Sequence, residues 1–212
     1  MEKERQPGKP VPRPGLHCTS LPEGRSNGKW HCKYDKDGNL TERYIGTGRW
    51  LDGKKEHWKY RWNADGSLAK VVRPDGEEVT FEYDALGRRL SKSFGTTVTR
   101  WMWNGNVPLH QWIQHRTYSW NDGNWEMEQE HSGRLLWLFD ERSFVPVAMI
   151  KEGRAYSILT DHLGTPTEAY DAEGNEVWSR ILDMDGNVIE ETGNKGMVPF
   201  LFQGQYYDWE TG

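Results

Sequence analysis

Short alternations of apolar and polar residues, separated by turns that contain glycine, fill the chain from residue 29 onward. Residues 78–83 (Glu-Val-Thr-Phe-Glu-Tyr) are a clear example. Successive side chains of a β-strand point to opposite faces, so this alternation predicts strands with one buried face. No segment combines a helical period with capping residues. The pattern therefore predicts an all-β fold of consecutive antiparallel β-hairpins over residues 29–212.

One turn pattern recurs along the chain: an aromatic residue, then Asp or Asn, then Gly three positions further on. Glycine supplies a positive φ at little cost, and the Asp or Asn can bond to its own backbone, so the pattern predicts hairpin turns. From Trp62 to Tyr83 and on to Trp103 the spacing is 21 and 20 residues, which suits two strands and two turns per repeat. Such a period is typical of a repeat array whose units bury their apolar faces against their neighbours. Good copies begin at Tyr34, Trp62, Tyr83, Tyr170 and Leu182, and weaker ones at Trp103 and Trp120.

Residues 1–28 have a different texture, because they hold five of the ten prolines. Proline locks φ and lacks an amide donor, so neither a helix nor a strand ladder is expected there. We predict a Pro-rich linker, or a strap lying over the folded part. Residues 9–14 also allow the alternative of a ligand for an SH3-type domain.

The composition predicts a core that is poor in aliphatic residues and rich in tryptophan. Leu, Ile, Val and Phe account for only 38 of the 212 residues, while 12 tryptophans supply large apolar surfaces. We therefore expect an ordered but thin, sheet-like core, with Pro146, Pro166 and Pro199 at strand ends or edges.

The charge balance and the lack of long apolar runs exclude several classes of protein. With 27 basic and 32 acidic residues and a net charge of −5, no electrostatic footprint for nucleic acid is expected. No apolar run is long enough for a membrane span, and the N-terminus lacks the apolar region of a secretory signal. We expect a cytoplasmic location after synthesis; if the protein leaves the cell, it does so by a route that needs no signal peptide or as part of a longer chain.

Two His-Cys pairs, His17-Cys18 and His31-Cys32, allow three interpretations: a Cys₂His₂ metal site, a disulfide, or two free thiols. Adjacent side chains on an extended chain diverge, so each pair would need a kink to bind one metal ion. Two free thiols are the default expectation, and no metal site or cofactor is predicted.

Two further groups of residues were weighed as chemical sites. Asp161-His162, with Ser157 nearby, suggests a general base of a hydrolase, but a turn explains both residues equally well. Asp183 and Asp185 have the spacing of the first and third positions of a calcium loop. The twelfth position of such a loop is normally Glu, but here it is Asn194, which weakens the calcium interpretation. Since no phosphate loop or nucleophile motif is present either, we expect no enzyme activity and no catalytic residues.

The stretch from Trp101 to Trp137 also allows two interpretations. Trp101 and Trp103 share a face by their period of two, as in a stacking platform for sugars or bases. The alternative, which we favour, is the aromatic lining of a thin sheet. The six tryptophans are Trp101, Trp103, Trp112, Trp120, Trp125 and Trp137.

Three motifs carry a family resemblance that extends over residues 30–212. Residues 83–90, Tyr-Asp-x-x-Gly-Arg-x-Leu, resemble a YD repeat. Residues 160–166, continuing through 170–178, and residues 199–212 resemble the C-terminal core signature of the Rhs family.

The resemblance implies a curved YD-repeat sheet of the kind that winds into a hollow cocoon around a C-terminal toxin. Rhs proteins are longer than this chain and continue into a self-cleavage motif and the toxin, so neither function is expected within residues 1–212. A segment of this size is expected to expose strand edges and part of an aromatic face.

The resemblance also implies a function. We expect a non-enzymatic shell segment that encapsulates a C-terminal toxin or helps to export it in interbacterial competition. The implied partners are the toxin domain and other Rhs shell segments, together with a type VI secretion apparatus and an immunity protein. The alternative is a Trp-rich surface module that binds a glycan or a protein partner through Trp112 or Trp125.

Overall fold

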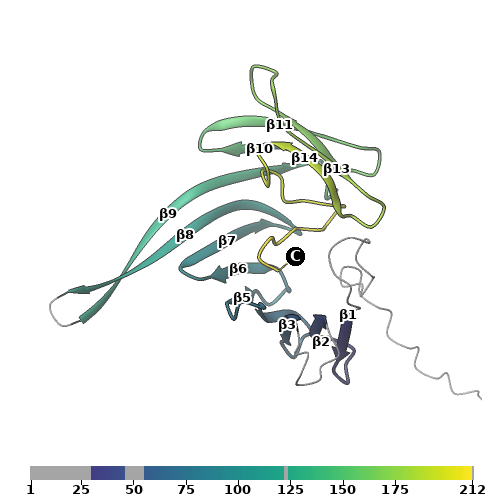
Figure 1. The fold of residues 1–212 in the computed structure, drawn as a ribbon. Helices are drawn as coiled ribbons and strands as arrows, with labels where there is room; N and C mark the ends of the chain where they lie inside the picture. Colours follow the sequence, from purple (N-terminus) through teal and green to yellow (C-terminus); the bar gives the residue numbers. More distant parts are fainter. Residues whose placement is uncertain (1–29, 46–54, 122–123, 212) are drawn as a thin grey trace, which may run out of the picture. The chain divides into compact units, whose positions relative to one another are not determined.

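The computed structural model describes residues 30–45, 55–121 and 124–211, and every regular element in these ranges is a β-strand (Figure 1). The fourteen strands follow one another in sequence order, each antiparallel to the next, and no helix occurs in the described ranges. The prediction of an all-β fold of consecutive hairpins is confirmed. The strands are β1 (Trp30–Tyr34), β2 (Leu40–Ile45), β3 (Lys55–Trp62), β4 (Leu68–Val72), β5 (Glu78–Tyr83), β6 (Arg89–Phe94), β7 (Thr97–Asn104), β8 (Val107–Asn121), β9 (Asn124–Phe139), β10 (Pro146–Lys151), β11 (Arg154–Thr160), β12 (Pro166–Tyr170), β13 (Glu176–Leu182) and β14 (Val188–Gly193).

The chain divides into two compact units, Met1–Thr80 and Phe81–Gly212. The first unit contains β1 to β4 and the start of β5, and the second contains the remaining strands. The predicted Pro-rich linker at residues 1–28 lies outside the described residues. Pro146 and Pro166 are the first residues of β10 and β12, where proline removes no needed ladder donor, as predicted.

Seven turns share one backbone geometry. The amide of the first turn residue donates to the carbonyl four positions on, and a glycine amide three positions on donates back to the first carbonyl. These glycines have φ between 76° and 89°, which a type I turn followed by a left-handed bulge residue requires. The turns predicted at the five good copies therefore form, as do those at Asp161 and at Asp75-Gly76, which begins at Arg73. The weaker copy at Trp103 instead forms a shorter connection between Asn104 and Val107, and the one at Trp120 includes residues 122–123, outside the described residues. The first residues are Asp35, Asn63, Arg73, Asp84, Asp161, Asp171 and Asp183.

The aspartate that begins five of these turns closes them with its side chain. At Asp171, for example, Oδ1 accepts the amides of Glu173 and Asn175 at 3.1 and 2.8 Å. These bonds favour the ionised carboxylate, so the pKa of Asp171 lies below its ordinary value, mainly because of the Asn175 side chain and backbone. Local chemistry within five residues thus determines each of these turns.

The first unit has a small core of its own around Tyr60, Val71 and Val79 on β3, β4 and β5. The indole nitrogen of Trp62 donates to the carbonyl of Leu40 at 2.7 Å, which ties β3 to the start of β2. The repeat aromatic therefore contributes a polar bond as well as an apolar surface.

The second unit has a core that crosses five neighbouring strands. One buried residue from each of β9 to β13 forms what we call the floor: Trp137, Met149, Ile158, Ala169 and Trp178. Val198 and Phe200, which follow the last strand, complete the same cluster. The expectation of a partly exposed aromatic face is therefore wrong for this part of the sheet, because the chain folds back and covers it.

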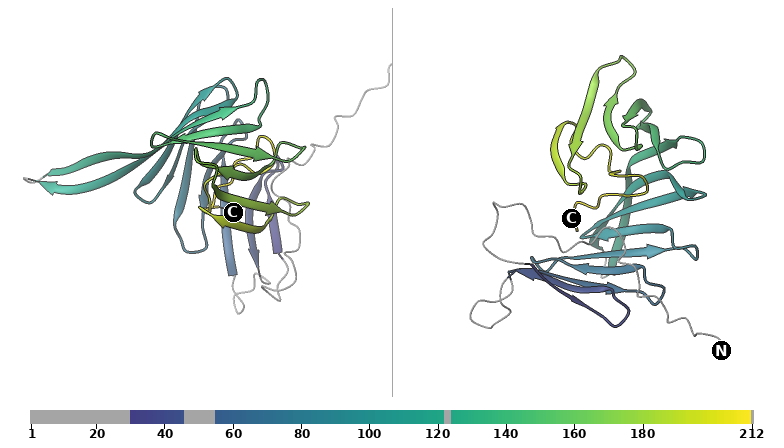
Figure 2. Two further views of the ribbon diagram at one scale, coloured as in Figure 1. Left: turned by 90° about the horizontal axis from the view of Figure 1, so that it is seen from above. Right: turned by 90° about the vertical axis from the view of Figure 1, so that its right-hand side faces the viewer.

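Strands β8 and β9 are much longer than their neighbours, with 15 and 16 residues, and their far end projects from the sheet of the second unit (Figure 2). Tyr118 pairs with Met127 near this end, and both side chains are exposed. Trp120 is also exposed, whereas Trp101 and Trp137 at the other end of the tryptophan-rich stretch are buried.

Candidate functional site

The most developed set of side-chain contacts in the second unit holds residues 194–211, which we call the tail. The tail runs from the end of β14 back across the sheet and reaches β6, as the yellow trace in Figures 1 and 2 shows. It is irregular apart from one bridge between Phe200 and Tyr206. Its position is therefore determined by what its side chains and carbonyl groups contact.

Arg180 holds the first part of the tail. It follows Trp178 by two positions on β13, so both side chains lie on the tail-covered face. The Arg180 side chain is buried and donates from Nη1 to the carbonyl of Val198 at 3.0 Å and from Nη2 to that of Phe200. Desolvation lowers the pKa of Arg180, while the charge of Glu191 opposes that shift. This cation binds backbone carbonyls, so it contacts the tail without regard to side-chain identity.

Tyr206 fills the middle of the covered face. Its ring packs edge-on against Trp101 and Phe200, with centroids 5.5 and 5.7 Å apart. Its hydroxyl donates to Oε1 of Gln111 on β8 at 3.2 Å. Burial raises the pKa of Tyr206, so the phenol stays protonated.

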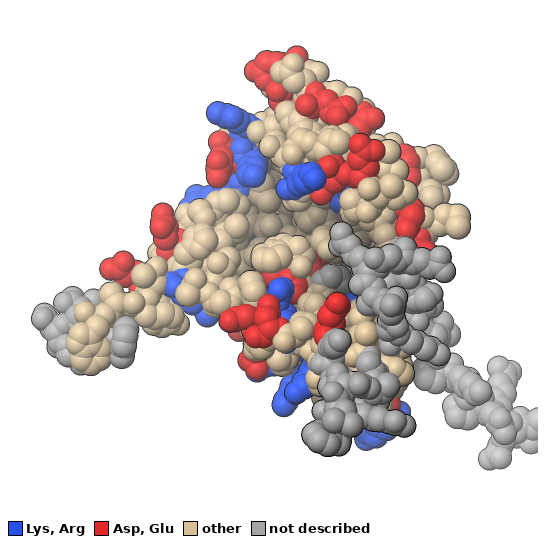
Figure 3. Space-filling model, viewed as in Figure 1, with Lys and Arg blue, Asp and Glu red and all other residues tan. Residues whose placement is uncertain are grey.

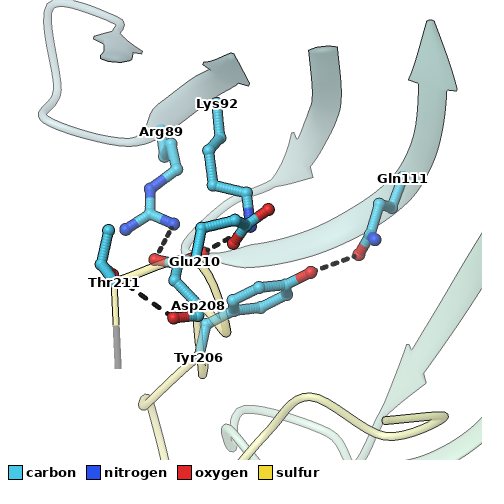
Figure 4. Close-up of polar contacts among 7 residues, drawn as sticks. All are labelled: Arg89, Lys92, Gln111, Tyr206, Asp208, Glu210 and Thr211. Atoms are coloured by element: carbon cyan, nitrogen blue, oxygen red, sulfur yellow. Dashed lines mark hydrogen bonds and ion pairs between the residues drawn. The ribbon is translucent and has the colours of Figure 1, made fainter. Parts of the chain in front are cut away.

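Two cations of β6 hold the end of the tail (Figure 4). Nζ of Lys92 lies 2.6 Å from Oε2 of Glu210 and 3.0 Å from Oδ1 of Asp208, and Nη1 of Arg89 lies 2.6 Å from Oδ2 of Asp208. The side chains of Lys92 and Glu210 are only 5% and 7% exposed, so these are buried ion pairs. Desolvation would lower the pKa of Arg89, but the nearby Asp208 carboxylate raises it overall. The cluster recognises two carboxylates at alternate positions of one chain.

A pocket of about 370 Å³ lies beside the middle of the tail. Trp101 and Trp103 both line it, as their period of two along β7 predicts. The indole nitrogen of Trp103 donates to the carbonyl of Arg89 at 2.7 Å, so this ring is held in place from β6. The other lining residues are Tyr83, Gly87, Arg88, Arg89, Asn106, Pro108, Phe139, Phe144, Phe200, Gly204, Gln205 and Tyr206.

The residues considered for hydrolysis have other contacts in the structure. Oδ1 of Asp161 accepts the amides of Leu163 and Thr165, both at 2.9 Å, and so closes a turn. The His162 side chain is exposed at that turn, and Ser157 is exposed on β11. The structure thus assigns Asp161 the turn role that the sequence had offered as the alternative.

The residues considered for metal binding are likewise accounted for where the structure describes them. Oδ1 of Asp183 accepts hydrogen bonds from the amides of Asp185 and Asn187, as in the other aspartate turns. His31 stacks on Tyr44 with 5.3 Å between ring centroids. No cluster of three or more metal-ligating side chains occurs within residues 30–45, 55–121 and 124–211.

Cys32 on β1 is bonded in a disulfide, so the default expectation of a free thiol is wrong for this residue. Spacing along the chain does not determine how far apart two thiols lie, which is why the sequence left this choice open. Cys18 and His17 lie outside the described residues.

The two tryptophans proposed for a glycan-binding surface lie on the β8–β9 hairpin. Trp112 is half-buried on β8, opposite Arg100 of β7. Trp125 pairs with Trp120 near the far end of the hairpin, and its side chain lies outside the described part of the structure. Trp120 is the tryptophan whose side chain is exposed there.

Reasoning from the sequence missed the residues that hold the tail, namely Arg89, Lys92, Arg180, Asp208 and Glu210. One signal was available for Arg180, because it occupies an inward position of β13 beside Trp178. A cation at an apolar position of an alternating strand indicates a buried polar partner.

Charge on the visible surface is mixed. Blue and red side chains are interspersed over the described residues on the face that Figure 3 shows. None of the described segments forms a helix with the length and apolar character needed to cross a membrane.

Together, these features define a β-hairpin repeat protein whose apolar face is covered by its own tail. The family model described as the teneurin YD-shell matches residues 25–212, and the chain belongs to this family. The resemblance to Rhs and YD-repeat proteins is thereby confirmed.

Curated relatives include several large toxin proteins. The chain is 29% identical over 207 residues to "Toxin protein Tse5" of Pseudomonas aeruginosa, covering 85% of this chain and 15% of that protein. It is 28% identical over 195 residues to "Probable deoxyribonuclease RhsA" of Dickeya dadantii, covering 86% of this chain and 12% of that protein. The chain thus spans less than a sixth of the length of either relative.

Among solved structures, one match is the crystal structure of TcdB2-TccC3-TEV. It matches 85% of this chain and 11% of that chain, with 14% identity and a TM-score of 0.46. The Photorhabdus luminescens Tc holotoxin pore matches 77% of this chain and 10% of that chain, with 13% identity and a TM-score of 0.40.

Proposed function

We propose that this chain is a non-enzymatic segment of a toxin-enclosing shell. The observation that carries the proposal is the match of the YD-shell family over residues 25–212, together with curated relatives that are named as toxins. The segment would supply consecutive hairpins to the wall, and the enclosed polypeptide would be the toxin.

The contacts of the polar side chains support a structural role. Turn aspartates such as Asp161 and Asp171 accept backbone amides, and Asp208 and Glu210 are ion-paired. These carboxylates bond to backbone amides or to buried cations, and such contacts favour a structural role over that of a general base.

The proposal includes partners that follow from a shell role. The toxin domain and further shell segments would contact the sheet, and an immunity protein would protect the producing cell. Export would use a type VI secretion apparatus after synthesis in the cytoplasm, and the toxin would act in competition between bacteria.

Protease protection tests the shell role. The complete reading frame containing residues 1–212 is expressed, together with the shell segments encoded beside it, and digested with a nonspecific protease. We expect the associated toxin polypeptide to survive digestion, and to be degraded in a Trp178→Asp variant that disrupts the floor. Trp120→Asp, at an exposed position, is the matched control and should retain protection. Degradation of the toxin polypeptide at equal rates with and without residues 30–211 would refute the shell role.

A further inference from the structure

The tail is attached to the sheet mainly by side-chain contacts. Its backbone meets a strand ladder at its start, where the amide of Asn194 donates to the carbonyl of Val177 at 2.9 Å. The amides of Lys195 and Gly196 then donate to the Gly193 carbonyl and to Oε1 of Glu191 on β14. Beyond them, backbone-to-backbone hydrogen bonds run within the tail, as from the Tyr207 amide to the Pro199 carbonyl and from the Gln205 amide to that of Phe202. The pairing of β6 to β14 with one another therefore uses none of the hydrogen bonds of residues 195–211.

The face beneath the tail carries three features that match three features of the tail. The floor accepts the apolar side chains of Val198 and Phe200. Arg180 donates hydrogen bonds to the backbone carbonyl groups of the same two residues, so this contact does not depend on their side chains. Lys92, together with Arg89, pairs with the carboxylates at positions 208 and 210. We call these features together the tail-binding face.

An empty tail-binding face would be strongly unfavourable. Trp137 and Trp178 are 1% and 0% exposed and share a core cluster with Val198 and Phe200 of the tail, so removal of the tail would open this cluster to water. Lys92 and Arg180, each about 5% exposed, would lose the groups that compensate their desolvation. The face therefore demands an occupant that is apolar at one end and acidic at the other.

We infer that the tail-binding face is a receptor for a separable polypeptide segment, and that the tail of a second copy of this chain can occupy it. The charge pattern identifies the occupant: an aromatic residue with carboxylates two and four positions later, as in Tyr206, Asp208 and Glu210. Reciprocal exchange of tails between two copies reproduces every contact and yields a symmetric dimer. This inference concerns the tail alone and does not depend on the proposed toxin role.

The tail of the same chain normally occupies the face because tethering gives it an effective concentration of about millimolar. Exchange of tails between two chains can be detected when the charges of a tail repel those of the tail-binding face on the same chain. One full-length variant carries Asp208→Lys and Glu210→Lys, and the other carries Arg89→Glu and Lys92→Glu. Each variant alone places like charges together, whereas an exchanged pair restores opposite charges at both faces.

Sedimentation velocity on the two variants tests the inference directly. We expect each variant alone and the wild-type chain to sediment as monomers, and an equimolar mixture of the variants to form a one-to-one dimer. Adding Phe200→Ala to both variants should weaken the mixed dimer, since it removes an anchor on the floor. A mixture that stays monomeric, with both variants folded by circular dichroism, would overturn the inference.

A peptide measurement covers the case in which charge reversal prevents folding. A fluorescein-labelled peptide of residues 194–211 is titrated into full-length chain carrying the milder Asp208→Asn and Glu210→Gln changes. We expect saturable binding that is on the order of a hundredfold weaker for wild-type chain, whose tethered tail competes. A control peptide with the same two neutral substitutions should bind at least tenfold more weakly than the native peptide.

Two outcomes of the peptide measurement would refute the inference. Absence of saturable binding to the variant chain would show that the tail is not separable. Equal binding of a polyglutamate peptide would show that the face attracts negative charge without recognising the tail. Toxin protection in the protease experiment is a separate readout, so either proposal can fail alone.

Discussion

Lys92 and Glu210 form a buried ion pair, with 2.6 Å between Nζ and Oε2, although 118 positions separate them in the chain. The pair joins the sixth strand to the end of the tail and so closes the covered face of the second unit. Because neither charge has access to bulk water, each depends on the other for compensation.

Breaking this pair should destabilise the chain strongly. We expect Lys92→Met to lower the free energy of unfolding by about 3 kcal/mol, because two carboxylates then lose a buried cation. In a double-mutant cycle with Glu210→Gln, measured by urea denaturation, the two losses should not add. The exposed pair of Lys70 and Glu78, also at 2.6 Å, is the control and should show a coupling below about 1 kcal/mol. Equal couplings for the two pairs would contradict the importance of burial here.

Removing the guanidinium of Arg180 should loosen the first part of the tail. Arg180→Met leaves the carbonyls of Val198 and Phe200 without their donor, which we expect to cost about 2 kcal/mol or more. Trypsin cleavage after the exposed Lys195 should become faster as the tail opens more often. Arg154→Met, at an exposed position of β11, should leave the cleavage rate unchanged.

Two glycines with nearly the same backbone angle allow a comparison of crowding. Gly164 has φ of 80° and Gly174 has φ of 84°, so alanine is strained at both positions. A Cβ at Gly164 would lie 2.5 Å from Cγ2 of Val145 and 2.6 Å from Nε2 of Gln203, whereas nothing lies within 4 Å at Gly174. We expect Gly174→Ala to cost about 1 kcal/mol, from backbone strain alone. Gly164→Ala should lower the free energy of unfolding clearly more, as measured by urea denaturation of both variants. Equal losses would show that Val145 and Gln203 can move aside for the added methyl group at little cost.

The turn aspartates should make stability depend on acidity. The pKa values of Asp84, Asp171 and Asp183 lie below the ordinary value of 3.8, through hydrogen bonds to nearby residues. Their contribution is therefore fully present above the pKa of the unfolded chain, and is lost as the pH falls below 3.8 through the lowered values. A triple variant with Asn at all three positions should be less stable at pH 7 and should lose less stability between pH 5 and pH 2, followed by urea denaturation. If the triple variant lost as much stability between pH 5 and pH 2 as the wild-type chain, these carboxylates would contribute nothing to the acid sensitivity.

The glycan-binding alternative makes a separate prediction about the long hairpin. A shell segment should show no saturable change in tryptophan fluorescence when titrated with a panel of glycans. A saturable change that disappears in Trp112→Phe or Trp125→Phe would support the surface module instead. Trp137→Phe is not a useful control, because its ring belongs to the floor.

The sequence by itself determined the local structure of this protein. Each Asp-x-x-Gly turn is formed by hydrogen bonds among residues no more than four positions apart, so pattern and structure coincide at Asp84 and Asp171. The order of the strands follows for the same reason, because short turns leave each strand no partner nearer than the next one.

Only the tertiary structure decided what covers the sheet. The tail forms no regular strand, and its partner Lys92 is an ordinary strand residue until Asp208 is brought to it. The inward position of Arg180 indicates a buried polar partner, but only the fold shows that this partner is the backbone of Val198 and Phe200. Contacts between groups more than a hundred positions apart leave no trace in local spacing, since burial and not sequence distance sets their strength. The hairpin turns could therefore be predicted from local residues, whereas the long β8–β9 hairpin, the tail and the tail-binding face became visible only once the chain was folded.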